Sequence, residues 1–149
     1  AYCWPDQTAR LSRLDAALRL ARDHKPQVDA GDAAAWLARQ LSEPAPGQTT
    51  LVTHTIAAQY FPTATSADCE AALQAAAATA SPNAPLAHFG MEFDGGDGAR
   101  LTLRLWDGAA RGWYLGRADF HGRWIRWAPA PMTPEDVKNA GLGLFGRRM

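Results

Sequence analysis

The residue types that could do chemistry gather most densely between Thr49 and Pro62, where the chain reads TTLVTHTIAAQYFP. The first half of this stretch is short, apolar and β-branched, which is typical of a buried strand. His54 interrupts the apolar run, and Gln59 and Tyr60 follow it closely. Ligands of open α/β sheets bind beyond the carboxyl ends of the strands, where a neutral imidazole can accept a proton or orient a substrate. His54 is therefore either a catalytic group at a strand end or a buried histidine that donates to a backbone carbonyl.

A second group of polar residues is the acidic turn VDAGD, in which Asp29 and Asp32 flank Gly31. Carboxylates at a strand-to-helix turn can accept hydrogen bonds from a ribose hydroxyl or an adenine amino group. Asp32 also precedes a helical pattern, so it suits the capping position of that helix. Each carboxylate has two oxygens, and both roles can coexist.

Two aromatic motifs have simpler structural interpretations. Trp4–Gln7 reads WPDQ, which fits a helix start with Trp4 as its hydrophobic anchor. His121–Trp124 reads HGRW, which fits a tight turn between two strands. The arginines that alternate with tryptophans around position 124 are compatible with base stacking, but the balanced charge of the chain argues against a nucleic-acid partner.

The composition excludes several classes of protein. The chain has 149 residues, 47% hydrophobic and 20% charged, which indicates a globular protein of about one domain. Fifteen basic and fifteen acidic residues give a formal net charge of zero, so nothing in the charge favours nucleic acid or an anionic membrane. Two cysteines are too few for a disulfide framework or a zinc site. No apolar span of about 18 residues and no signal peptide occur, which predicts a reduced cytoplasmic protein.

Familiar catalytic motifs are also missing from the sequence. There is no nucleophile elbow, P-loop or HExxH pattern, and the four histidines have no local metal-ligand spacing. The glycines of GGDG and GLGLFG do not lie between a strand and a helix, so neither is a dinucleotide loop. Hydrolase chemistry based on His54 lacks a nucleophile. We predict no metal site.

Three helices are expected from the apolar spacing. The first runs from Pro5 to about Asp23, and the second from Ala33 to about Ser42, burying Trp36, Leu37 and Leu41. The third is expected from Ser66 to Ala78, with Thr65 and Asp68 as a capping box and a small-residue stripe of Cys69, Leu73 and Ala76. A narrow stripe of that kind packs closely against a flat partner such as a sheet.

The strands are expected to form a sheet of mixed direction. A short strand over 27–30 and a second over 49–55 alternate with the helices, which predicts parallel strands with crossover helices. From Pro85 the apolar period becomes two, and DGGDG is a hairpin signal that predicts an antiparallel meander through strands at 101–105, 113–115 and 124–127. We predict an α/β domain or domain fragment over 1–128. The tail over 129–149 should be loosely ordered, with one helical turn near 134–138.

These residues, taken together, resemble a known family. The segments that carry the resemblance are WPDQTARLSRL, VDAGDAAAWLARQL, LVTHTIAAQYFP, PLAHFGMEFD and DFHGRWIRW. In this order they are similar to the C-terminal half of the bacterial domain-of-unknown-function family twenty-three thirty-two, with Cys3 and Thr55 as minor departures. The resemblance covers nearly the whole chain up to about Pro129. Because the chain starts without methionine and enters a helix almost at once, we expect it to be a fragment of a longer polypeptide.

The family resemblance implies a function. Its members are about twice this long, and their first half resembles a class I S-adenosylmethionine-dependent methyltransferase. The present chain would then be the C-terminal portion of a Rossmann-like methyltransferase-type sheet, with 49–55 as its fourth strand. The implied catalytic residues are His54, Gln59 and Tyr60, and Asp29 and Asp32 would bind the cofactor. The glycine-rich loop would lie upstream.

Two expectations follow for the chain by itself. Without the upstream loop, it should bind S-adenosylmethionine poorly or not at all and be inactive in methyl transfer to its unknown small-molecule substrate. Its sheet should have an apolar edge that another chain covers, for instance in a homo-oligomer. The alternative is a non-catalytic α/β module that is retained for protein–protein interaction.

Overall fold

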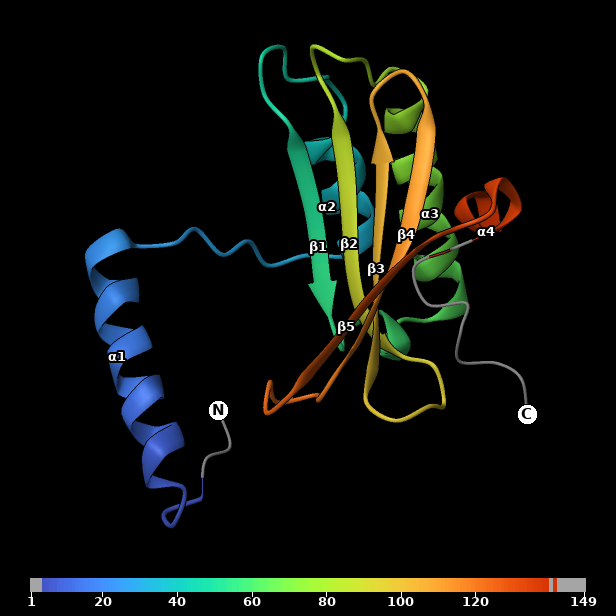
Figure 1. Cartoon of the computed structure of the whole chain (residues 1–149). Coiled ribbons are helices and arrows are strands. Elements are labelled where there is room, and N and C mark those ends of the chain that lie inside the picture. Colours follow the sequence, from blue (N-terminus) through green and yellow to red (C-terminus); the bar gives the residue numbers. More distant parts are fainter. Residues whose placement is uncertain (1–3, 140, 142–149) are drawn as a thin grey trace. The chain divides into compact units, whose positions relative to one another are not determined.

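The computed structural model describes residues 4–139 and 141, and the chain divides into two compact units between Ala30 and Gly31. The first unit contains helix α1 (Thr8–His24), whose described side chains are all at least partly exposed (Figure 1). The helix that the sequence predicts from Pro5 is confirmed, with a start three residues later. It ends at Lys25, which adopts a left-handed φ of 45° and donates its N–H to the carbonyl of Ala21.

The short strand predicted over 27–30 is wrong. This stretch has no regular secondary structure, and Val28 is 88% exposed. A strand needs a neighbouring strand to take up its backbone hydrogen bonds, and none of the described strands pairs with this segment.

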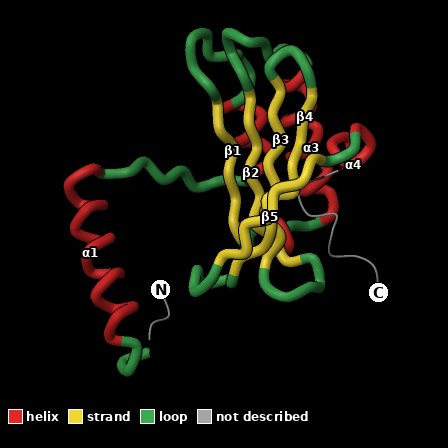
Figure 2. Tube along the Cα trace, viewed as in Figure 1, coloured by secondary structure: helices red, strands yellow, loops and turns green. Residues whose placement is uncertain are grey.

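The second unit is built on a five-stranded sheet in the order β1-β2-β3-β4-β5 (Figure 2). Its strands are β1 (Thr50–Thr55), β2 (Leu86–Phe93), β3 (Ala99–Trp106), β4 (Ala110–Ala118) and β5 (Ile125–Pro131). β1 and β2 are parallel, and every later pair is antiparallel. The mixed α/β class and the late meander are therefore confirmed, whereas the Rossmann-like relationship stays a hypothesis because the sheet has a single parallel pair.

The connection between β1 and β2 contains the short 3₁₀ helix η1 (Ala58–Tyr60) and helix α3 (Thr63–Ala77). Figure 1 shows α3 and α2 (Ala33–Gln40) behind the sheet in this view. The main core lies between these helices and the sheet, and its buried members are Ala34, Leu37, Ala58, Cys69, Leu73, Leu86 and Trp106. The predicted packing stripe of α3 is thus confirmed at Cys69 and Leu73, which are 2% and 0% exposed.

Two details of the helices differ from the sequence-based expectation. Helix α3 begins at Thr63, directly after Pro62, so the predicted capping box at Thr65 is wrong. A proline has a fixed φ and disfavours helix in the residue before it, which sets the boundary at Pro62. In α2, Leu37 is buried as expected but Trp36 is 38% exposed, because the adjacent residue of a helix points about 100° away.

The C-terminal part of the described chain packs on β4. Met132 and Val137, the latter on helix α4 (Pro134–Asn139), are buried beside Tyr114. A Cβ on Gly112 would lie 2.8 Å from the side chains of both Met132 and Val137, so a larger residue there would force these side chains to move. The helical turn predicted near 134–138 is confirmed, whereas 142–149 lie outside the described residues. One domain over 1–128 with a loose tail stays a prediction. None of the described helices is long and apolar enough to cross a membrane.

Candidate functional site

The carboxyl end of β1 is followed by a tight and strained turn. Ile56 has a left-handed φ of 49° and donates its N–H to the carbonyl of Met91 on β2, 2.8 Å away. A β-branched residue rarely adopts this conformation, because its Cβ substituents crowd the backbone. Such strain persists only where surrounding contacts enforce it, and it is commoner at functional sites than elsewhere.

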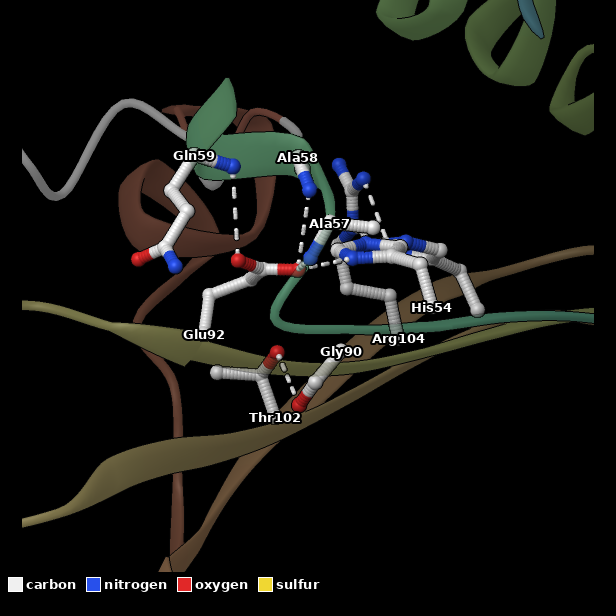
Figure 3. A network of polar contacts seen from close by, with 9 residues as sticks. His54, Ala57, Ala58, Gln59, Gly90, Glu92, Thr102 and Arg104 are labelled. Atoms are coloured by element: carbon white, nitrogen blue, oxygen red, sulfur yellow. Dashed lines mark hydrogen bonds and ion pairs between the residues drawn. The ribbon is translucent and has the colours of Figure 1, made fainter. Parts of the chain in front are cut away.

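The carboxylate of Glu92 holds this turn to the end of β2. Its Oε1 atom accepts the backbone N–H groups of Ala57 and Ala58 at 3.0 and 3.1 Å, and Oε2 accepts the N–H of Gln59 at 3.4 Å. Figure 3 shows the carboxylate directed at these amides, with His54 beside it. Glu92 thus satisfies the first N–H groups of η1, which have no partner within the helix itself.

His54 joins Glu92 to a second histidine. Its Nδ1 atom lies 2.7 Å from Glu92 Oε1, and its Nε2 atom lies 2.9 Å from Nε2 of His88. The two rings meet through these nitrogens, with centroids 5.0 Å apart and planes inclined by 29°. Gly90, the register partner of His54 on β2, leaves room for the ring, since a Cβ there would lie 3.4 Å from two of its atoms.

Arg104 on β3 continues this chain of contacts into helix α3. Its Nε and Nη2 atoms both lie 3.2 Å from Nδ1 of His88, and its guanidinium donates to the two carboxylate oxygens of Glu70 at 2.7 and 2.8 Å. Arg104 is 1% exposed and His88 is 3% exposed. We call Glu70, Arg104, His88, His54 and Glu92 the Glu92 network.

The donors and acceptors of the Glu92 network fix its protons. A guanidinium can only donate, so Nδ1 of His88 accepts and its Nε2 carries the proton. That proton points at Nε2 of His54, which must therefore accept, and Nδ1–H of His54 donates to Glu92. Both histidines are neutral in this arrangement, and every polar atom between Arg104 and Glu92 has a partner.

Burial and charge explain two shifted pKa values in the network. Burial, the charge of Arg104 and the nearby His54 together lower the pKa of His88 from 6.5 to about 2. For Glu92, burial alone would raise the pKa, but the hydrogen bonds from His54, Ala57 and Ala58 outweigh it and lower the pKa of this carboxyl. The neutral imidazole of His88 and the ionised carboxylate of Glu92 match the proton assignment.

Comparison with known proteins places the chain in a family. The family model described as "Uncharacterized protein conserved in bacteria (DUF2332)" matches residues 1–127. The chain belongs to this family. No curated protein and no solved structure matches it.

In this DUF2332 chain, the structure brings some of the predicted site residues together. His54 and the backbone of Gln59 meet at the Glu92 carboxylate, and the side chains of Gln59 and Tyr60 are exposed on η1, with Tyr60 at 76%. Because both ring nitrogens of His54 are engaged, His54 acts on the turn and on His88 in this state. A catalytic role for His54, Gln59 and Tyr60 stays a prediction.

The acidic residues predicted to bind a cofactor lie in different settings. Asp32 Oδ1 accepts the N–H groups of Ala34 and Ala35 at 3.0 and 3.1 Å, which confirms its role as the cap of α2. Asp29 belongs to the first unit, where its Oδ1 accepts from the side-chain amide of Gln27 at 3.4 Å. Cofactor binding by either carboxylate stays a prediction.

Of the two aromatic motifs, HGRW has the structural role that the sequence favours and WPDQ does not. Gly122 has a left-handed φ of 74° and donates to the carbonyl of Asp119, so HGRW forms a tight turn before β5. Trp4 is 70% exposed, so the prediction that it anchors the helix start by burial is wrong. Its carbonyl accepts the N–H of Gln7 ahead of α1. Within residues 4–139, no group of three or more His, Cys, Asp or Glu residues is arranged to hold a metal ion.

Sequence reasoning missed four members of the Glu92 network in DUF2332, namely Glu70, His88, Glu92 and Arg104. One signal could have found three of them. His88 and Glu92 lie on one face of β2, and Arg104 interrupts the apolar strand β3 in the same way that His54 interrupts β1. Isolated polar residues in neighbouring apolar strands indicate a shared buried network.

Proposed function

We propose that the carboxyl end of β1 is the substrate-contacting rim of an S-adenosylmethionine-dependent methyltransferase-like protein. The observation that carries this proposal is the strained turn 56–60, held by Glu92 at the end of a strand whose neighbour is parallel. Ligands of α/β sheets bind at this position. The exposed side chains of Gln59 and Tyr60 contact the acceptor substrate, and His54 positions the turn.

The acidic residues that precede and cap α2 fit only one part of the cofactor. A carboxylate at Asp29 or Asp32 can accept from the adenine amino group or a ribose hydroxyl, and the oxygen of Asp32 that caps α2 leaves its Oδ2 outside those two bonds. The glycine-rich loop that holds the rest of such a cofactor is expected upstream. When bound, S-adenosylmethionine supplies an electrophilic methyl group. The residues of this chain contribute orientation of the acceptor and shielding of the site from water.

Calorimetry with S-adenosylmethionine and S-adenosylhomocysteine tests this proposal. We expect a longer family protein that includes the upstream half to bind and be stabilised, while the present chain gives a flat trace. Asp32→Asn keeps a good helix cap but removes a negative charge, so it should weaken cofactor binding in the longer protein about tenfold or more at unchanged melting temperature. Asp68→Asn, on the exposed side of α3, is the matched control. A flat trace from the longer protein would overturn the cofactor assignment.

A second candidate function is protein contact through the outer edge of β1. This strand lies at one end of the sheet, and among the described strands it pairs with β2 alone. It contains no proline and no Asp, Glu, Lys or Arg, and Leu51 is 58% exposed. Unprotected edges of this kind pair readily with a second strand.

Light scattering of the chain tests this candidate across a concentration series. If the edge pairs with a second copy, a dimer forms, and Leu51→Lys returns it to monomer without loss of helical signal. Val28→Lys, an exposed apolar residue outside the sheet, should leave the dimer intact. A monomer at all concentrations would remove self-association through β1 from consideration.

A further inference from the structure

In the Glu92 network, only one hydrogen atom can lie between the Nε2 atoms of the two histidines. The Nε2 atoms of His54 and His88 lie 2.9 Å apart, a hydrogen-bond distance that requires one donor and one acceptor. The proton belongs to His88, because the donors of Arg104 occupy its other nitrogen. A second proton on His54 would place two N–H groups against each other.

The other tautomer of His88 does not remove this repulsion between two N–H groups. If Nε2 of His88 were to accept from a protonated His54, its Nδ1 would carry hydrogen and point at Arg104 Nε and Nη2, both 3.2 Å away. The guanidinium cannot turn aside, because it is buried and its donors are bound to Glu70. The network is compatible with a neutral His54 and with no other state of that residue.

We propose that the contact between His54 and His88 acts as an acid-sensitive latch. The contact holds the turn 57–60 in place while His54 is neutral and releases the turn when His54 is protonated. A protonated His54 keeps its attraction to the Glu92 carboxylate and turns away from His88. Glu92 moves with it, and the amides of Ala57 and Ala58 lose their acceptor. In function this latch rests on the role proposed above for Gln59 and Tyr60, since it would release the turn that carries them.

The charges around the histidine pair favour this response to acid. The Glu92 carboxylate on β2 lies 2.7 Å from Nδ1 of His54, whereas burial and the charge of Arg104 on β3 lower the pKa of His88. Glu70 on α3 is neutralised by Arg104, and Arg100, the register partner of Glu92, forms an ion pair with Asp94. Cys69 on α3 stays a thiol, because burial raises its pKa. The low pKa of His88 keeps that imidazole neutral in acid.

The latch predicts the tautomer of each of the two histidines, which can be measured on the unmodified chain. Long-range proton–nitrogen spectra at neutral pH should show hydrogen on Nδ1 of His54 and on Nε2 of His88. The opposite tautomer at either ring would overturn the proposal, because the single-proton contact would then not exist.

Hydrogen exchange of the amides of Ala57, Ala58 and Gln59 tests the opening itself, without any ligand. As the pH falls from about 7 to about 5, protection of these amides should drop by about tenfold per unit, the signature of one coupled proton. His54→Gln cannot take up that proton and should abolish the response. His121→Gln, on the exposed turn before β5, should retain it.

Two outcomes of the exchange experiment would overturn the latch. One is protection in the unmodified chain that follows only the intrinsic pH dependence of exchange, and the other is an undiminished response in His54→Gln. Neither outcome touches the proposed cofactor or substrate, because the experiment contains no ligand. Conversely, a flat calorimetric trace from the longer protein would leave the latch intact.

Discussion

Glu70 on helix α3 and Arg104 on strand β3 are joined by two parallel hydrogen bonds of 2.7 and 2.8 Å. The guanidinium is 1% exposed, whereas the carboxylate side chain is 19% exposed. This pair fixes α3 against the sheet and orients the arginine toward His88. The remainder of the Glu92 network depends on it, because Arg104 determines which nitrogen of His88 carries hydrogen.

Loss of the Glu70 carboxylate should destabilise the second unit strongly. Glu70→Ala leaves a buried cation without its partner, and we expect the free energy of unfolding to fall by about 3 kcal/mol. Glu70→Gln keeps an acceptor oxygen and should cost less. Chemical denaturation measures both. Asp107→Ala breaks an exposed pair with Arg111 as a control and should cost less than about 1 kcal/mol. Equal losses for the Glu70 and Asp107 variants would contradict the buried role of this pair.

Stability should fall as the solution becomes acidic, because His88 cannot take up a proton in the folded state. Burial, Arg104 and His54 lower the pKa of His88 from 6.5 to about 2. Below about pH 6.5, His88 therefore binds a proton in the unfolded chain but not in the folded chain. The free energy of unfolding then decreases toward pH 2 by up to about 1.4 kcal/mol per pH unit.

Urea titrations of the unmodified chain and of a His88 variant measure this effect between about pH 6.5 and about pH 4.5, where most carboxylates stay ionised. The variant His88→Gln can still accept from Arg104 and donate to His54, but it does not titrate. The slope of its free energy of unfolding against pH should be smaller, by the contribution of about one bound proton. An identical slope in both proteins would show that His88 is protonated in the folded state.

A methyl group at Gly90 should disturb the site while every polar residue of the site stays unmutated. The added Cβ of Gly90→Ala would lie 3.1 Å from Thr102 Oγ1 and 3.4 Å from two atoms of the His54 ring. We expect a loss of about 1–3 kcal/mol in the free energy of unfolding and faster exchange of the amides at 57–59. Gly31→Ala meets nothing within 4 Å and serves as the control, with a change of no more than about 1 kcal/mol. If Gly90→Ala left the free energy of unfolding unchanged, the His54 ring would have space to move.

The cap of α2 gives a prediction about charge and geometry. Asp32→Ala removes the acceptor for the N–H groups of Ala34 and Ala35 and should cost about 1 kcal/mol. Asp32→Asn keeps an acceptor oxygen at the same place and should change stability by a few tenths of a kcal/mol. Thermal unfolding distinguishes the two. If Asn were as costly as Ala, the charge of Asp32 rather than its cap would be stabilising the chain.

Local patterns predicted most of the elements. The β-branched run before His54 and the period of two after Pro85 are both strands, and DGGDG is the turn between β2 and β3. The prediction failed at 27–30, where an apolar residue and a turn signal indicated a strand that has no partner. A segment forms a strand only where a neighbouring strand can pair with it, and the local sequence does not show whether that neighbour exists.

The candidate site was predicted in part. The sequence indicated that His54, Gln59 and Tyr60 gather at the end of β1, and it kept open whether His54 is buried or catalytic. It did not identify Glu92, which lies 38 residues beyond His54 and yet accepts a hydrogen bond from its ring. The parallel register that places His54 opposite Gly90 decides this contact, and register is a property of two strands rather than one.

The sequence by itself determined where most helices and strands form and that one histidine interrupts an apolar strand, because propensity and periodicity act within a few residues. Only the tertiary structure decided what that histidine does. The packing of α3 on the sheet buries Arg104, and Arg104 sets the tautomer of His88. His88 in turn leaves His54 a single N–H, which donates to Glu92. Contacts between residues 16 to 38 positions apart carry that information, and they exist only once the chain has folded.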